Sequence, residues 1–109
     1  MIFAIANHVE QIINRTKTQT RRENDRYQIG KTYAVQPCRT CKAIKEGRIL
    51  ILSKKLEVCC EFISVEDAKA EGGYTPKEFF ELYQKLHPNW LSRMAYTFRF
   101  IPKKKENLT

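Results

Sequence analysis

The residue types best suited to chemistry lie together in one hexapeptide, Lys-Thr-Gln-Thr-Arg-Arg, at residues 17–22. A neutral lysine amine accepts a proton, and a threonine hydroxyl becomes a nucleophile when a neighbouring base takes its proton. The two arginines that follow supply fixed positive charge, and their guanidinium groups suit recognition of phosphate through paired hydrogen bonds. The hexapeptide is therefore the first candidate for a reactive or ligand-binding site.

The protonation of Lys17 decides whether it acts as the base. Its pKa must fall well below the ordinary value of about 10.4 for the neutral amine to be populated. Burial and the nearby charges of Arg21 and Arg22 lower the pKa of a lysine, whereas a neighbouring carboxylate raises it. The sequence leaves this balance open.

The chain totals indicate one globular domain. Of the 109 residues, 42% are hydrophobic and 29% are charged, which is typical of a water-soluble fold. No apolar run approaches the roughly 20 residues of a membrane-spanning helix. Residues 1–6 lack the basic start of a signal peptide. We therefore expect a cytoplasmic protein with no membrane partner, and the sequence does not indicate its oligomeric state.

The formal charge of +8 is unevenly distributed along the chain. Residues 14–55 and the segment from residue 93 onward are strongly basic, whereas residues 56–92 are acidic. A fold that brings the two basic segments together has a basic face, which favours phosphate-bearing partners such as RNA. The alternative is a charged surface that serves solubility alone.

Hydrophobic periodicity and capping signals predict an α+β fold. Asn7 with Glu10, and Thr75 with Glu78, have capping-box spacing, and a glycine pair at residues 72–73 is typical of a helix end. The hexapeptide should lie in a loop after the first helix. The apolar stripe of the last helix, Phe79, Leu82, Tyr83 and Leu86, is interpreted as core. The predicted helices cover residues 7–14, 65–70 and 76–86, and the predicted strands cover residues 2–6, 32–36, 48–52, 56–63 and 95–101.

In the last predicted strand Tyr96, Phe98 and Phe100 alternate with polar residues and should face inward. Short strands with two or three peripheral helices favour a small mixed β-barrel or a strongly bent sheet.

The order of five motifs resembles the ASCH family, a branch of the PUA-like β-barrels associated with RNA. The resemblance covers residues 2–101. It implies one ASCH domain at residues 1–102, a small PUA-like mixed β-barrel, and a basic tail at residues 103–109. The motifs are the hexapeptide, Gly-x-x-Tyr-x-Val-Gln-Pro at 30–37, Glu-Gly-Arg-Ile at 46–49, Ala-Glu-Gly-Gly-Tyr at 70–74 and Tyr-Thr-Phe-x-Phe at 96–100.

The resemblance also implies a reaction. Some ASCH proteins are amidohydrolases that remove the acetyl group of N4-acetylcytidine with a lysine, a threonine and a glutamate, and without a cofactor or metal. Motif matching places these at Lys17, Thr20 and Glu71, although the double-glycine spacing after Glu71 differs by about one residue. The hypothesis is attack by Thr20 on the acetyl carbonyl and hydrolysis of an acyl-threonine.

A non-catalytic RNA-binding module that uses the same cleft is the alternative, and a ribonuclease is a weaker one. In either case the partner is a modified nucleoside or RNA, and the tyrosines are candidates to stack on a base. The predicted ligand contacts are Arg21, Arg22, Tyr33, Arg39, Lys42, Arg48, Tyr74 and Tyr96.

The four cysteines leave three states open. Cys38 and Cys41 have the spacing of a zinc half-site, but the adjacent Cys59 and Cys60 do not. The alternatives are reduced and buried cysteines, a disulfide between the two pairs, and a structural zinc.

Overall fold

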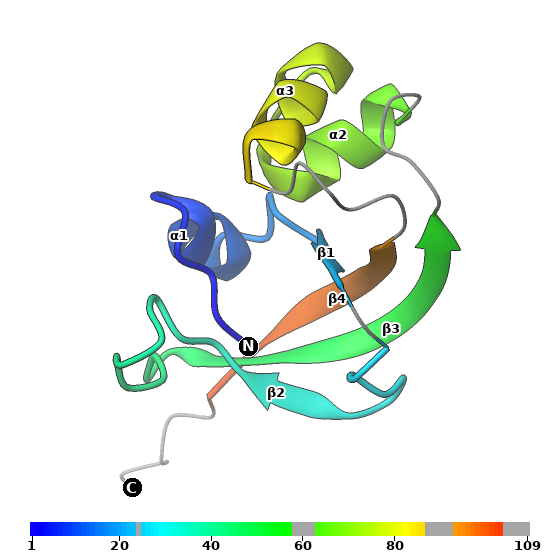
Figure 1. The fold of residues 1–109 in the computed structure, drawn as a ribbon. Coiled ribbons are helices and arrows are strands. Elements are labelled where there is room, and N and C mark those ends of the chain that lie inside the picture. The colour runs from blue at the N-terminus through cyan, green and yellow to red at the C-terminus, as the bar shows by residue number, and fades with distance from the viewer. Residues whose placement is uncertain (24, 58–62, 87–92, 104–109) are drawn as a thin grey trace, which may run out of the picture.

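The computed structural model describes residues 1–23, 25–57, 63–86 and 93–103, which form a sheet with three helices (Figure 1). The small α+β class predicted from the sequence is thereby confirmed. In chain order the elements are α1 (His8–Ile13), β1 (Gln19–Arg22), β2 (Thr32–Ala34), β3 (Gly47–Glu57), α2 (Val65–Gly72), α3 (Pro76–Leu86) and β4 (Arg93–Pro102).

The sheet is antiparallel and has the strand order β1-β4-β3-β2. Its centre is the long pair β3 and β4, and β3 bends strongly along its length (Figure 1). The edge strands have only four and three residues and flank opposite sides of this pair. Because the edges do not pair with each other, the described strands form an open sheet. The expectation of a mixed, closed barrel is wrong for this part of the chain.

Three of the five predicted strands are present with other bounds, as β2, β3 and β4, whereas residues 2–6 do not form a strand and residues 56–57 belong to the end of β3. Residues 2–6 contribute only one parallel bridge, between Ile2 and Gln36. The strand predicted at 48–52 continues without a break to Glu57, because β4 pairs with it along nearly its whole length. Residues 58–62 lie outside the described part. The last four residues of the hexapeptide form strand β1 rather than a loop, since β4 supplies a pairing partner to each of them.

The three helices lie where the sequence predicted them, and the capping box predicted at Thr75 and Glu78 is confirmed. The Ser64 hydroxyl accepts from the Asp67 backbone at 3.0 Å. Thr75 and Glu78 form the reciprocal capping box, at 3.2 and 3.0 Å. The Asn7 cap is wrong: its backbone is left-handed, with φ 72°, and its side chain makes no cap hydrogen bond. Within the described residues, no helix has the length and apolarity needed to cross a bilayer.

The core has two parts. The larger lies between the sheet and α1, and it contains the inward-facing Tyr96, Phe98 and Phe100, as the alternation predicted. The smaller lies beneath α2 and α3 and contains Phe79 and Tyr83. Both helices lie on the side of the sheet where β3 ends and β4 begins (Figure 1).

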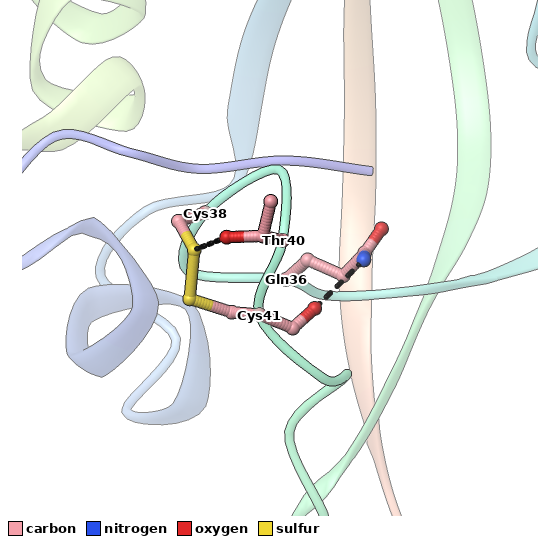
Figure 2. The surroundings of a disulfide bond; sticks show 4 residues. All are labelled: Gln36, Cys38, Thr40 and Cys41. Atoms are coloured by element: carbon pink, nitrogen blue, oxygen red, sulfur yellow. Dashed lines mark hydrogen bonds between the residues drawn. A yellow bond between two sulfur atoms is a disulfide. The ribbon is translucent and has the colours of Figure 1, made fainter.

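Cys38 and Cys41 are joined by a disulfide in the loop between β2 and β3 (Figure 2). Gln36 Nε2 donates to the Cys41 carbonyl at 3.0 Å beside it. The prediction of reduced cysteines, or of a bridge to the later pair, is wrong for these two, because their Cα atoms lie 5.0 Å apart and within bonding range of each other. Cys59 and Cys60, with residues 104–109 of the predicted tail, lie outside the described part.

Buried and exposed side chains alternate in the first half of β3, and this alternation leads to a prediction about stability. Ile51 is fully buried opposite Phe98, whereas its neighbour Leu52, at the bulge in the β3–β4 register, is 45% exposed. We expect Ile51→Ala to lower the free energy of unfolding by about 2–5 kcal/mol, because it leaves a cavity in the core. Leu52→Ala is the matched control and should cost about 0.5 kcal/mol. Urea denaturation measures both, and equal losses would contradict the register described here.

Candidate functional site

A cavity of about 350 Å³ lies between the N-terminal segment, β1, α2 and α3. This is within the range of about 300–1,000 Å³ usual for small-molecule sites. Lys17, Thr20 and Glu71 all line it, so groups that are up to 54 residues apart converge at one place. The full lining is Ile2, Phe3, Ala4, Ile5, His8, Lys17, Thr20, Arg21, Arg22, Glu71, Phe79, Leu82, Tyr83 and Leu86.

Backbone contacts hold the Lys17 segment against the end of α2. The Thr18 amide donates to the Ala70 carbonyl at 2.9 Å. Lys17 Nζ donates to the backbone carbonyls of Glu71 and, at 2.9 Å, of Gln19. The ammonium thus satisfies a carbonyl in the last turn of α2, where a cation is favoured by the helix dipole. This docking brings Glu71 to the hexapeptide.

The environment of Lys17 favours loss of its proton. The side chain is only 2% exposed, and its ammonium lies 6.0 Å from the centre of the Phe3 ring. Burial lowers its pKa to about 8; the Glu71 carboxylate opposes this shift and Arg22 adds to it. The sequence left open whether the Lys17 pKa is raised or lowered. Burial is the largest effect, and it lowers the pKa.

Thr20 is held on strand β1, where its backbone pairs with Tyr96 of β4. The side chain is almost fully buried and contributes to the cavity wall. Among the described residues its hydroxyl has no hydrogen-bond partner. A threonine on a paired strand has a fixed position, and this hydroxyl is available to a bound ligand.

Arg21 connects Glu71 to the rest of the fold. Its Nη1 donates to Glu57 Oε2 at 2.6 Å, and its Nε lies 3.4 Å from Glu71 Oε2. Its guanidinium also lies 5.5 Å from the centre of the Phe79 ring. Burial raises the pKa of Glu71, while the charges of Lys17 and Arg21 oppose this. Arg21 thus ties β1 to β3, α2 and α3.

Arg22 fixes the opposite wall of the cavity. Its Nη2 donates to the Ile2 carbonyl at 2.7 Å, and its guanidinium lies 4.9 Å from the centre of the Phe3 ring. These contacts hold the N-terminal segment, which the sequence did not connect with the hexapeptide, against β1.

Six predicted ligand residues do not line the cavity. Tyr96 is 0% exposed, and its hydroxyl accepts from the Tyr27 amide, so its ring is not available to stack on a base. Tyr33 packs edge-on against Tyr27, with ring centres 4.9 Å apart. Tyr74 is not among the lining residues, and its hydroxyl contacts His8, which is one of them. The side chains of Arg39, Lys42 and Arg48 are exposed on and beside the disulfide loop.

Sequence reasoning missed the apolar wall and one polar member. The stripe on α3 does bury Phe79 and Tyr83, but it also faces the cavity, and Leu86 at its end is 48% exposed. His8 also lines the cavity, where burial and the charges of Lys17 and Arg22 lower its pKa to about 4. The sequence contains one indication of a role for His8, which is its position at the start of an otherwise apolar helix face.

The comparisons with known proteins identify the fold. No protein-family model and no curated protein matches the chain. Protein EF3133 from Enterococcus faecalis V583, of family DUF984, superposes with a TM-score of 0.65 and 14% identity over 85% of this chain and 66% of its own length. Hypothetical protein PH0355 superposes with a TM-score of 0.65 and 11% identity, over 92% of this chain and 96% of its own length. At such identities the similarity shows a shared fold and leaves the function to the site.

The opposing effects on Lys17 give a prediction. In the wild-type protein its amine should titrate near pH 8, as followed by NMR of ¹³C-labelled lysine side chains. Glu71→Gln removes the charge that raises this pKa, so the midpoint should fall further. The control, Glu66→Gln, changes an exposed carboxylate on the same helix and should leave the midpoint in place. A midpoint at the value of free lysine would show that the amine is not buried.

Proposed function

We propose that this protein is a small amidohydrolase of the ASCH type, which removes the acyl group from N4-acetylcytidine or a related acylated nucleoside. The observation that carries the proposal is the meeting of a buried lysine, a threonine and a buried glutamate at one cavity of ligand size. The motif resemblance supplies the substrate class, because these three positions match the residues of the deacetylating ASCH proteins.

The first step is the attack of Thr20 on the acyl carbonyl. With a pKa of about 8, roughly one Lys17 amine in ten is neutral at pH 7. As the bond between the Thr20 oxygen and the carbonyl carbon forms, the hydroxyl proton passes to Lys17 and the carbonyl electrons move to its oxygen. Lys17 and Thr20 are not hydrogen-bonded in the unliganded form, and such contacts commonly close when substrate binds.

The second step breaks the amide bond. The oxyanion collapses, the C–N bond breaks, and Lys17 returns the proton to the nitrogen of the leaving cytosine amine. Water then attacks the acyl-Thr20 ester and gives up a proton to Lys17. As the bond between the acyl carbon and the Thr20 oxygen breaks, Lys17 returns that proton to the Thr20 oxygen, which releases the acid and restores the free hydroxyl and the neutral amine. Glu71, held by Arg21, positions Lys17 through its backbone carbonyl and keeps a carboxyl group at the cavity.

The state of the cavity arginines favours a neutral ligand over a phosphate. Arg21 is ion-paired with two carboxylates, and Arg22 donates to a backbone carbonyl. A phosphate in this cavity has to displace such partners, whereas an acylated base meets mostly apolar walls. RNA binding, the alternative function, is better served by the exposed basic side chains of Arg39, Lys42 and Arg48, and would show a steep dependence on salt.

Thr20 provides the most direct test. Thr20→Val keeps the shape of the side chain and removes the hydroxyl, so release of cytidine from N4-acetylcytidine should stop. Thr20→Ser restores a hydroxyl and should recover a substantial part of the turnover. Chromatography of the released cytidine measures both variants. Full turnover by the valine protein would contradict the acyl-threonine mechanism.

The pH dependence tests Lys17. Because the neutral amine is the active form, kcat/KM should rise about tenfold per pH unit and level off above about pH 8. Lys17→Met should lower kcat/KM by about 10²–10⁴-fold, as expected for removal of a general base. Lys31→Met, at an exposed lysine outside the cavity, is the matched control. A rate that falls as the pH rises to 8 would exclude Lys17 as the base.

A further inference from the structure

We propose that His8 is a ligand-binding residue of the cavity, which donates a hydrogen bond from Nδ1 to a carbonyl oxygen of the bound nucleoside, and that Tyr74 fixes the tautomer it needs. This inference rests on the proposed function and names a fourth polar member of the same site. Neither residue belongs to the set of three on which the mechanism is built.

The first support is the orientation of the His8 ring. Its Nε2 lies 2.8 Å from the Tyr74 hydroxyl, and the two rings meet edge-to-face with centres 6.0 Å apart. Tyr74 is not a lining residue, whereas His8 is. Since Nε2 is turned toward Tyr74, which does not line the cavity, we assign the cavity-facing edge of the ring to the side that carries Nδ1.

The second support is Gly72, the first glycine of the pair after Glu71. A Cβ at this position would lie 2.8 Å from Tyr74 Cε2 and 3.0 Å from His8 Nε2. A side chain here would therefore push the pair apart. Gln11 Nε2 also donates to the Gly72 carbonyl at 3.1 Å, which holds this backbone in place. The glycine thus has a local role, which is to leave room for the His8–Tyr74 contact.

The third support is the protonation state of the two rings. Burial disfavours a second proton on the His8 ring, and the charges of Lys17 and Arg22, which also line the cavity, add to this effect. On the Tyr74 side, burial and the carboxylates of Glu71 and Glu78 raise the pKa of the phenol, which keeps its proton. In the arrangement that we propose, the neutral imidazole accepts the hydrogen bond of the phenol at Nε2 and carries its own hydrogen on Nδ1.

The role follows from this arrangement. A neutral Nδ1–H donor binds a carbonyl oxygen without adding a third positive charge beside Lys17, so it does not depress the basicity of that amine in the way a protonated histidine would. His8 touches the ligand, and Tyr74 is a positioning residue that acts through His8.

NMR of ¹⁵N-labelled histidine tests the tautomer in the free protein. His87→Gln leaves His8 as the only histidine in the chain. At pH 7 we expect Nδ1 to be protonated and Nε2 to be unprotonated. Tyr74→Phe removes the donor and should shift His8 toward the other tautomer, whereas Tyr33→Phe, which also loses one phenol hydroxyl, should not. An Nε2–H tautomer in the wild-type protein overturns the proposal whatever the ligand.

Binding of N4-acetylcytidine to the Thr20→Val protein tests the contact without turnover. In this background His8→Phe should weaken binding by about 10–100-fold, the effect of losing a buried hydrogen bond to the ligand. Tyr74→Phe should weaken it less, and the double variant should bind like His8→Phe alone, because both act through one imidazole. Tyr33→Phe should bind like its parent.

The outcomes separate the two proposals. If N4-acetylcytidine is hydrolysed by the wild-type protein and His8→Phe binds as well as its parent, the inference about His8 is wrong and the proposed function stands. If the nucleoside neither binds nor reacts, the proposed function and the His8 contact both fail. Additive losses for His8→Phe and Tyr74→Phe would show that Tyr74 does not work through His8.

Discussion

The site depends on one contact, the docking of the Lys17 ammonium onto the last turn of α2. Two backbone carbonyls, those of Gln19 and Glu71, replace the water that the ammonium loses on burial. Carbonyl dipoles stabilise the cation only in part, so the lysine remains folded inside with a lowered pKa. The same contact brings the Glu71 side chain to β1. The contact that satisfies the helix end is therefore also the one that gathers the polar residues of the cavity.

Arg21 gives this arrangement its rigidity, because it joins four elements through one side chain. Glu57 on β3 and Glu71 on α2 share its guanidinium, which lies over the α3 ring of Phe79. A buried ion pair of this kind seldom adds net stability over an apolar replacement, since desolvation of the charges offsets their attraction. The ion pairs of Arg21 instead hold these elements in position. Removal of Arg21 would leave the carboxylates of Glu57 and Glu71 without the cation that lies between them.

The sequence predicted what local signals encode. The Thr75–Glu78 cap and the inward-facing aromatics of β4 were readable because each depends on neighbouring residues. Prediction from the sequence failed where a partner that is distant along the chain determines the local structure. Residues 19–22 look like a loop until β4 pairs with them, and β3 runs on to Glu57 for the same reason. Lys17, Thr20 and Glu71 were found through motif matching, whereas His8 carries no motif and becomes visible only when Tyr74 and Gly72 are placed beside it.

The presence of three buried charged side chains in the cavity needs a reason, because burial of a charge costs free energy. Lys17, Arg21 and Glu71 are all nearly fully buried, and each loses hydration on folding. If the site served packing alone, apolar side chains of similar volume would fill it at a lower cost in free energy. Glu57 and Glu71 compensate the charge of Arg21. Glu71 also raises the pKa of Lys17, but burial outweighs it and leaves an amine with a pKa of about 8. A buried amine in that state supports the proposed proton transfer to a ligand, because it lies at the same cavity as a threonine hydroxyl that has no hydrogen-bond partner among the described residues.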